Sequence, residues 1–422
     1  MKSLRHGPIR TAACFGGALL GSASLVLAQD AGSLDKLEKE NQELRKRLDA
    51  LEAVVKKEGL LPAGNAAPSP VAAMSSVILS GYVQTSYFFN STKPHDREGD
   101  GYLWNTRHDS FSLNKFKVTL ASPPVERSGD KWDAGYKASL IWGEDAPVLD
   151  TGLGVAGFGN VREAFVELNA PIGTGLDIKA GQLISLLNWE SGDGGAANPN
   201  FSQGYQWFFT GNGPSTGVQL SYSFTDWLDV TARVQDGLYA GPVSQHGSKN
   251  YIGSIGLKPT KGLWVNLLGF GGNADPVAPT VKGGSLLAGY DVTSQFHTGL
   301  EFDYFDWERK GTSDAKLWSI GGWAWYDFTP QVGLALRAEY LDDEDGFGIK
   351  GVGLPGRPNS AVGATAPENK GKVESVALTL NWHPLPRIKI QPEIRYDHTS
   401  YTAGFDGKRD RVVFGAGATY LF

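Results

Sequence analysis

The 422-residue chain contains very little sulfur, with one cysteine, Cys14, and two methionines. Cys14 lies in an N-terminal stretch that we expect to be removed, so disulfides, cysteine catalysis and cysteine-ligated metals are excluded in the mature protein. After that stretch no apolar run reaches the roughly 18 residues of a spanning helix. The formal charge is −6, which gives no reason to expect a nucleic-acid partner. If this chain crosses a membrane, it must do so with strands.

Motifs for catalysis and cofactors are also missing. The seven histidines fall mostly in the N-terminal stretch, loops or turns, and His297, on a predicted strand, has no evident serine partner. No metal-ligand pair has helical i, i+4 spacing, and no glycine-rich phosphate loop joins a strand to a helix. The acidic run 342–345 lacks the ligand spacing of a calcium loop and reads as an exposed loop. We therefore predict no enzyme, no cofactor and no metal site.

What the sequence does contain begins with an export signal over residues 1–28. Lys2, Arg5 and Arg10 form a basic start, and a run of small and apolar residues follows. The run ends at Ala28 with the small residues typical of a cleavage site. The sequence therefore predicts a protein that leaves the cytoplasm.

A short coiled-coil helix is predicted for residues 29–58, in the periplasm. Apolar residues recur there at alternating spacings of three and four, as in a heptad seam, and Gly59 and Pro62 end the helix. The alternative is a single solvated helix, and the seam does not distinguish a dimer from a trimer. Residues 59–76, rich in Pro and Ala, read as an extended linker. The predicted seam residues are Leu34, Leu37, Asn41, Leu44, Leu48 and Leu51.

From Val77 to the C-terminus the apolar pattern has a period of two. In residues 387–397, for example, Ile388, Ile390 and Ile394 alternate with polar or charged residues. The segment 77–422 is therefore predicted to be an all-β transmembrane barrel, antiparallel and up-and-down, with about 16 strands. The predicted strands are 77–89, 109–121, 131–142, 161–169, 175–183, 215–224, 227–236, 249–258, 262–272, 284–292, 295–306, 315–328, 331–341, 372–382, 387–397 and 410–422.

The connections between these strands alternate between short turns and long loops. Turns such as 225–226 and 329–330 have two residues, whereas loops such as 184–214 and 342–371 have about thirty. This asymmetry is typical of outer-membrane barrels. Aromatic residues near the strand ends predict two interfacial girdles. They are Phe89, Trp132, Trp142, Trp227, Trp264, Phe296, Trp307, Trp318, Phe328 and Trp382.

The last predicted strand, 410–422, places apolar residues at every second position. We expect it to pair with 77–89, because closure of the sheet removes both exposed edges. Its aromatic residues Tyr420 and Phe422 resemble the C-terminal signal that the outer-membrane insertion machinery reads. These two residues are therefore predicted to act in assembly.

Several stretches of the middle of the chain resemble the OmpL-like β-barrel porin family. They are Val161–Leu168, Leu176–Gln182, Asn200–Ser202, Pro214–Val218 and Gln235–Gly237. The resemblance covers nearly all of 77–422 and implies a diffusion channel in the outer membrane. The chain departs from the family pattern at Gln203 and Ser215, where that pattern has a basic residue and a histidine.

A barrel of about sixteen strands encloses a water-filled lumen, and the loop 184–214 is the candidate to narrow it. We predict Glu190 and Asp193 as constriction residues opposite a basic wall, where they would set up a transverse field. The alternative is that these charges pair across the lumen. Residues 205–209 read either as packing of the loop or as an aromatic slide for sugars. The predicted wall residues are Lys115, Lys117, Lys179, Arg233, Arg337, Arg395 and Arg411.

Three functions remain open from the sequence. The first is a passive porin in outer-membrane lipid, a homo-oligomer that we expect, from the heptads and by analogy with general porins, to be a trimer. The second is an envelope tether whose helix contacts the cell wall. The third is a channel specific for a sugar or an anion.

Overall fold

The computed structural model describes residues 43, 46–47, 76–101, 104–149, 159–238, 240–241, 243, 247–274, 280–308, 314–346, 349, 362 and 366–422. The chain divides into two units, Met1–Ser76 and Val77–Phe422. Within the described residues, no helix has the length and hydrophobicity needed to cross a membrane. All strands of the described residues lie in the second unit.

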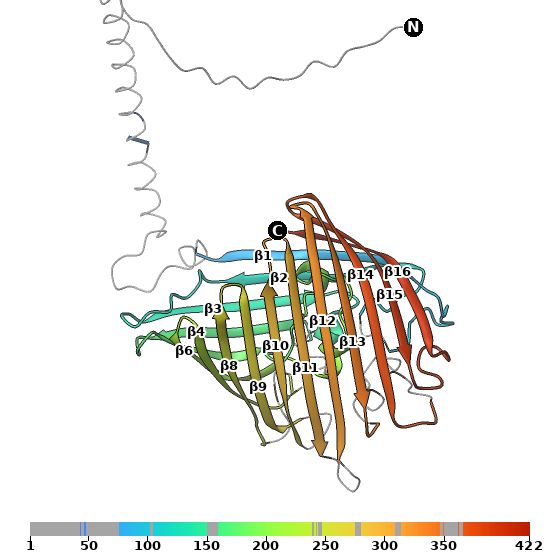
Figure 1. The fold of residues 1–422 in the computed structure, drawn as a ribbon. Helices are drawn as coiled ribbons and strands as arrows, with labels where there is room; N and C mark the ends of the chain where they lie inside the picture. The colour runs from blue at the N-terminus through green and yellow to red at the C-terminus, as the bar shows by residue number, and fades with distance from the viewer. Residues whose placement is uncertain are drawn as a thin grey trace, which may run out of the picture. The chain divides into compact units, whose positions relative to one another are not determined.

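Sixteen antiparallel strands form one closed barrel, each paired with its neighbours in the sequence (Figure 1). All sixteen predicted strands are present, with ends shifted by at most four residues. The strands are β1 Ile78–Asn90, β2 Ser110–Ala121, β3 Asp133–Trp142, β4 Val161–Ala170, β5 Leu176–Leu183, β6 Ser215–Thr225, β7 Leu228–Gln235, β8 Asn250–Thr260, β9 Leu263–Asn273, β10 Thr280–Asp291, β11 Phe296–Glu308, β12 Ala315–Thr329, β13 Val332–Asp343, β14 Gly371–Leu385, β15 Ile388–Thr399 and β16 Asp410–Leu421.

The first and last strands close the barrel, as predicted. β1 and β16 pair in register from Tyr82 opposite Leu421 to Asn90 opposite Val413. Beyond the ladder, Gly81 and Phe422 exchange two backbone hydrogen bonds of 3.0 Å. The seam therefore leaves no exposed strand edge at which another chain could pair.

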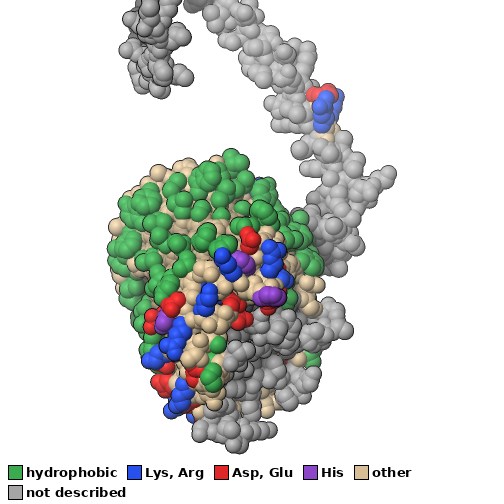
Figure 2. Space-filling model, turned by 90° about the vertical axis from the view of Figure 1, so that its right-hand side faces the viewer, with side chains coloured by type: hydrophobic (Ala, Val, Ile, Leu, Met, Phe, Trp, Pro, Cys, Tyr) green, Lys and Arg blue, Asp and Glu red, His purple; other side chains and the backbone are tan. Residues whose placement is uncertain are grey.

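Residues of the strands alternate between the inside and the outside of the barrel, apart from irregular points such as Asn114 and Lys115 of β2, which are both buried. In β14, twelve consecutive residues from Gly371 are alternately buried and exposed. The exposed face of the strands carries large apolar residues, among them Val166, Ile255 and Ile394. Figure 2 shows one face of the molecule, on which hydrophobic side chains gather over one part and charged side chains over another. The wall is therefore suited to lipid, and the polar face of each strand lines the lumen.

Two of the predicted girdle residues face inward instead. Trp307 is only 1% exposed and packs in an apolar cluster inside the barrel, and Trp264 packs at the edge of the same cluster. Each lies one residue away from the lipid-facing positions of its strand, so the pleat turns it inward. By contrast, Trp132, Trp227 and Phe328 are more than half exposed, as a girdle requires.

Short turns lie at one end of the barrel, which we call the short-turn end, and long loops lie at the other, the long-loop end. The exception is the segment 122–132, which is longer than the other connections at the short-turn end. It folds against the inner wall, where Arg127 pairs with Asp177 at 2.7 Å and Asn169 donates to two of its carbonyls. This segment covers part of the lumen at that end.

The predicted coiled coil lies almost entirely outside the described residues, including every seam residue from Leu34 to Leu51. The described residues Glu43, Lys46 and Arg47 are helical, and Arg47 lies 3.5 Å from Glu43 with both side chains exposed. The seam and the linker therefore stay predictions.

Deletion of Phe422 is expected to lower the yield of assembled barrel strongly. The deletion removes the pair of hydrogen bonds with Gly81 and a ring that covers this glycine. Heat-modifiable migration on gels measures the assembled fraction. Replacement of the lipid-facing Phe414 by leucine is the control, and equal assembly of the deletion and the control would contradict the proposed role of Phe422.

Candidate functional site: a loop packed inside the barrel

The segment between β5 and β6, residues 184–214, lies inside the barrel. Its backbone is held by inward-facing side chains of strands distant in the sequence. Glu393 accepts from the N–H of Phe201 at 2.9 Å, Lys389 donates to the carbonyl of Asn198 at 2.7 Å, and Arg395 donates to that of Gln203 at 3.0 Å. We call this segment the lumen loop. It contains two short helices, η1 Gly194–Ala196 and α4 Tyr205–Phe209.

Glycines at the contact points leave space for the lumen loop. A Cβ atom at Gly417 in β16 would overlap the ring of Phe201, and one at Gly321 in β12 would overlap Gln206. Phe201 also stacks on Phe88 of β1, with ring centroids 5.5 Å apart. The loop is therefore seated closely against the wall by shape as well as by hydrogen bonds.

Glu190 binds the wall through a buried ion pair with Arg337 of β13. The Glu190 Oε1 atom lies 2.9 Å from Arg337 Nη1 and accepts from the indole N–H of Trp323 at 3.2 Å. Arg337 also lies 3.1 Å from Glu339 and donates to Ser202. Both partners of the Glu190–Arg337 pair are almost fully buried. This pair fixes the first part of the lumen loop to β13.

Asp193 pairs with Lys117 of β2 at 2.8 Å and accepts from the hydroxyl of Tyr82 at 3.0 Å. Burial alone would raise the pKa of Asp193, but the charges of Lys117 and Arg162 and these hydrogen bonds lower it overall. Asp193 is therefore an anion at neutral pH. Each of the two predicted loop acids therefore pairs with a cation of the wall. This is the alternative in which the charges pair across the lumen, and not the one in which free acids face a basic surface.

The other predicted wall residues are inward-facing as well, and most have acidic partners. Lys115 lies 3.1 Å from Asp145, and Lys179 lies 3.5 Å from Glu167. Arg233 forms no ion pair among the described residues and donates instead to Gln219 and to the carbonyl of Ile184, where the lumen loop begins.

Arg395 and Arg411 share one buried acid, Asp397 of β15. Their Nε atoms lie 2.7 and 2.8 Å from its two oxygens. Arg411 also donates to the hydroxyl of Tyr205 at 2.6 Å. Sequence reasoning found the two arginines but missed Asp397. The alternation of inward residues in this strand was the only available clue.

The aromatic residues of α4 pack against the wall. Tyr205 and Phe209 are buried in an apolar cluster that includes Phe270, Phe305 and Trp307 of the inner wall. Residues of the long loops, such as Ile349 and Phe405, belong to the same cluster. The packing interpretation accounts for Tyr205 and Phe209, while Trp207 and Phe208 are partly exposed.

The accessible charged surface of the lumen lies on strands that these loop contacts do not cover. On β3 to β5 the side chains of Lys137, Glu167 and Lys179 are 20–38% exposed. Lys179 also lies over the ring of Phe165, 5.1 Å from its centroid. Charges of both signs alternate here, so a solute that passes the lumen loop meets a mixed polar surface.

The sequence of residues 76–422 matches one protein family, described as "Putative beta-barrel porin-2, OmpL-like". The chain belongs to this family. No curated protein matches the chain. The match agrees with the resemblance found in the sequence and extends over the whole barrel.

Solved structures share the barrel of this OmpL-like porin. The anion-selective porin of Comamonas acidovorans has a TM-score of 0.54 at 12% identity, covering 82% of this chain and 99% of its own. The trimer form of OmpT of Vibrio cholerae has a TM-score of 0.53 at 12% identity, covering 82% of this chain and 99% of its own. The channel DcaP of Acinetobacter baumannii has a TM-score of 0.52 at 15% identity, covering 82% of this chain and 97% of its own. At these identities the likeness shows the fold alone.

Two loops at the long-loop end of this OmpL-like porin meet through a pair of acids. The backbone N–H of Asp100 donates to Asp406 at 3.2 Å, and that of Asp406 donates to Asp100 at 3.1 Å. Burial, and secondly the charge of Asp406, raise the pKa of Asp100 to about 6. The contact is therefore strongest when Asp100 is protonated.

We expect the contact between these loops to weaken as the pH rises through about 6. Because the folded pKa of Asp100 is raised, its stabilising effect is complete below the unfolded value of about 4 and is lost above the folded one. Current noise in single-channel recordings should therefore increase between pH 5 and pH 7. An Asp406→Asn variant should show a smaller increase, and noise independent of pH in the unmodified protein would contradict the expectation.

Proposed function

We propose that the protein is a porin of the outer membrane, through which small hydrophilic solutes and ions diffuse passively. The observation that carries the proposal is a closed sixteen-strand barrel with an apolar outer face and an inner face that keeps accessible charges on β3 to β5. Barrels of this size enclose water. The family match supports the same function. By the asymmetry of such barrels, the short-turn end faces the periplasm and the long-loop end faces the exterior.

The lumen loop narrows the channel and sets its size limit in this proposal. Because Glu190 and Asp193 are neutralised by Arg337 and Lys117, they act first as anchors and only secondarily as a charge filter. The accessible charges of the remaining wall have both signs. We therefore expect discrimination by size to exceed discrimination by charge.

Planar-bilayer recording of the purified protein tests the proposal. Stepwise conductance increments with a modest cation/anion ratio are the expected result. A protein that is fully assembled by heat-modifiable migration yet gives no conductance would overturn it.

A double variant, Glu190→Gln with Asp193→Asn, tests the part played by the two loop acids. We expect it to shift ion preference toward anions and to increase conductance, since it leaves Arg337 and Lys117 without these partners. The exposed pair Lys131 and Glu126, at 2.7 Å, provides a control with Glu126→Gln. Unchanged conductance and ion preference in the double variant would remove the loop acids from the mechanism.

The proposal also covers the oligomeric state and the N-terminal region. We infer a homotrimer in outer-membrane lipid: the predicted heptads favour an oligomer, and the trimer form of OmpT among the similar structures supports three copies. Cross-linking that yields monomers alone would contradict it. Deletion of residues 29–76 separates a porin from a tether, because a porin keeps its conductance whereas a tether loses its attachment to the cell wall.

A further inference from the structure

Aromatic rings form a continuous column along the inner wall between the lumen loop and the short-turn end. Trp189 of the lumen loop stacks on Trp323 of β12 at 4.4 Å and meets the edge of Trp325 at 5.9 Å. His297 of β11 then stacks on Trp325 at 5.0 Å, with an interplanar angle of 16°. Successive inward positions of β12 thus present Trp323, then Trp325, then Asp327, toward the short-turn end.

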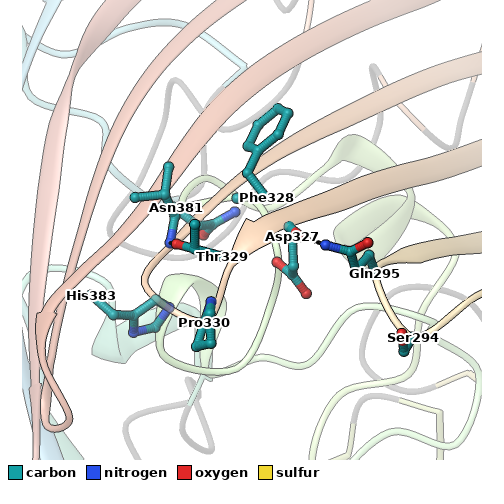
Figure 3. Close-up of a pocket in the computed structure, with 10 residues that line it drawn as sticks. Ser294, Gln295, Asp327, Phe328, Thr329, Pro330, Asn381 and His383 are labelled. Atoms are coloured by element: carbon teal, nitrogen blue, oxygen red, sulfur yellow. Dashed lines mark hydrogen bonds between the residues drawn. The ribbon is translucent and has the colours of Figure 1, made fainter. Parts of the chain in front are cut away.

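Two cavities adjoin the end of this column that is nearer the short-turn end of the barrel, and they share three lining residues. The larger, of about 540 Å³, lies between the turns that follow β10 and β12 and the last residues of β14 (Figure 3). The smaller, of about 210 Å³, lies between the lumen loop and Trp325. Asp327, Asn381 and His383 line both. Trp325 and Lys389 line only the smaller cavity, and the larger one adjoins it at the three shared residues.

The polar groups around Trp325 carry both donors and acceptors. The carboxylate of Asp327 is 48% exposed, and its Oδ2 atom lies 3.6 Å from His297. Lys389 lines the smaller cavity and is held by the carbonyl of Asn198 at 2.7 Å. A Cβ atom at Gly333 would lie 2.5 Å from Asp327, so this glycine provides the space for the carboxylate. The surroundings thus combine the acid Asp327, the amide of Asn381 and the two basic side chains of His383 and Lys389.

The position of Trp325 is fixed before any solute arrives. His297 stacks on it and is itself held by Asp291 at 2.6 Å, while Trp189 abuts it from the lumen loop. A ring that is already immobile loses little conformational entropy when a solute binds.

We propose that Trp325, with Asp327, Asn381, His383 and Lys389, forms a binding subsite for the ring of a neutral sugar. The inference rests on the proposed porin function and deepens it. An indole offers an apolar surface for the C–H face of a sugar ring, and acids, amides and amines bind its hydroxyl groups. An anion would meet the exposed Asp327 carboxylate, and a hydrophobic solute would meet four polar side chains. A neutral polyhydroxylated ring fits both the aromatic and the polar parts.

The order of the rings in the column also indicates where along the channel a solute would bind. Trp323 is only 3% exposed and lies beside the Glu190–Arg337 pair, whereas Trp325 is partly exposed. A sugar that has passed the lumen loop therefore meets Trp325 at the exit toward the short-turn end. The subsite is placed to hold solute after the constriction.

Block of single-channel current by maltose, added on the periplasmic side, tests the subsite. Sorbitol, an open-chain polyol, and inorganic phosphate are the comparison probes. We expect maltose to reduce the current in a concentration-dependent way and sorbitol to have little effect. Trp325→Ala should weaken the block by about tenfold, and Trp325→Phe should keep most of it.

Trp318→Ala is the matched control, because Trp318 lies on the same strand and packs against Tyr340 on the outer face. It should leave the block unchanged, and heat-modifiable migration verifies that each variant is assembled. A conducting channel with no maltose block, or with equal block in Trp325→Ala, overturns the subsite and leaves the porin function intact. Stronger block by phosphate than by maltose assigns an anion site and also overturns the proposal. Absence of conductance overturns the porin function and the subsite together.

Discussion

Replacement of Arg337 by methionine is expected to increase single-channel conductance several-fold and to make the open current unsteady. Arg337 joins Glu190 of the lumen loop to Glu339 and also donates to Ser202. Its removal leaves two buried acids without this cation, and the loss of one partner of a buried pair costs about 3–5 kcal/mol. The lumen loop would then leave the wall for part of the time.

Two further variants separate this effect from a general loss of stability. Glu190→Gln combined with Arg337→Met removes one unpaired acid, so its current should be steadier than that of the single variant. Lys372→Met breaks an exposed pair with Asp342 at 3.0 Å and should change conductance little. A conductance in Arg337→Met equal to that in Lys372→Met would show that the lumen loop is not held by this pair.

Replacement of Asp397 by asparagine is expected to destabilise the barrel by a few kcal/mol and to shift ion preference toward anions. Asp397 is the shared partner of Arg395 and Arg411, and all three side chains are buried. Without the acid, two guanidinium groups stay charged in the lumen. Each also holds the lumen loop, at Gln203 and at Tyr205, so the loop should loosen as well.

Unfolding in urea measures the stability of the Asp397→Asn variant, and reversal potentials in a salt gradient measure its ion preference. Asp410→Asn is the control, since Asp410 lies in the neighbouring strand but is exposed. If both variants showed the same stability and the same ion preference, the shared acid would have no special role.

The barrel could be predicted almost completely from the sequence, whereas the contacts inside it could not. An apolar period of two can be recognised within a single strand, so each strand could be predicted separately. The alternation of short and long connections then predicted the topology. The inward girdle residues Trp264 and Trp307 show the limit of this reasoning. A shift of one residue along the strand decides whether an aromatic residue at the strand end faces lipid or the lumen. The predicted strand ends were not accurate to one residue.

The course of the lumen loop depends on contacts between residues that lie far apart in the chain. Glu190 and Arg337 are separated by 147 positions, and many other inward cations could have taken the same place. The stacked rings of Trp189, Trp323 and Trp325 raise the same difficulty, because no spacing in the sequence relates a loop tryptophan to a strand tryptophan. Sequence reasoning identified Glu190 and Asp193, but not the residues that neutralise them.

The position of Phe201 has a consequence for the order in which the protein assembles. Its ring lies among Phe88 of the first strand and Val413 and Gly417 of the last, and so spans the closing seam from within. Since β16 is the final strand of the chain, this contact cannot be completed until the barrel closes. Docking of the lumen loop is therefore completed only when the barrel closes, and the loop in turn supports the seam from the inside.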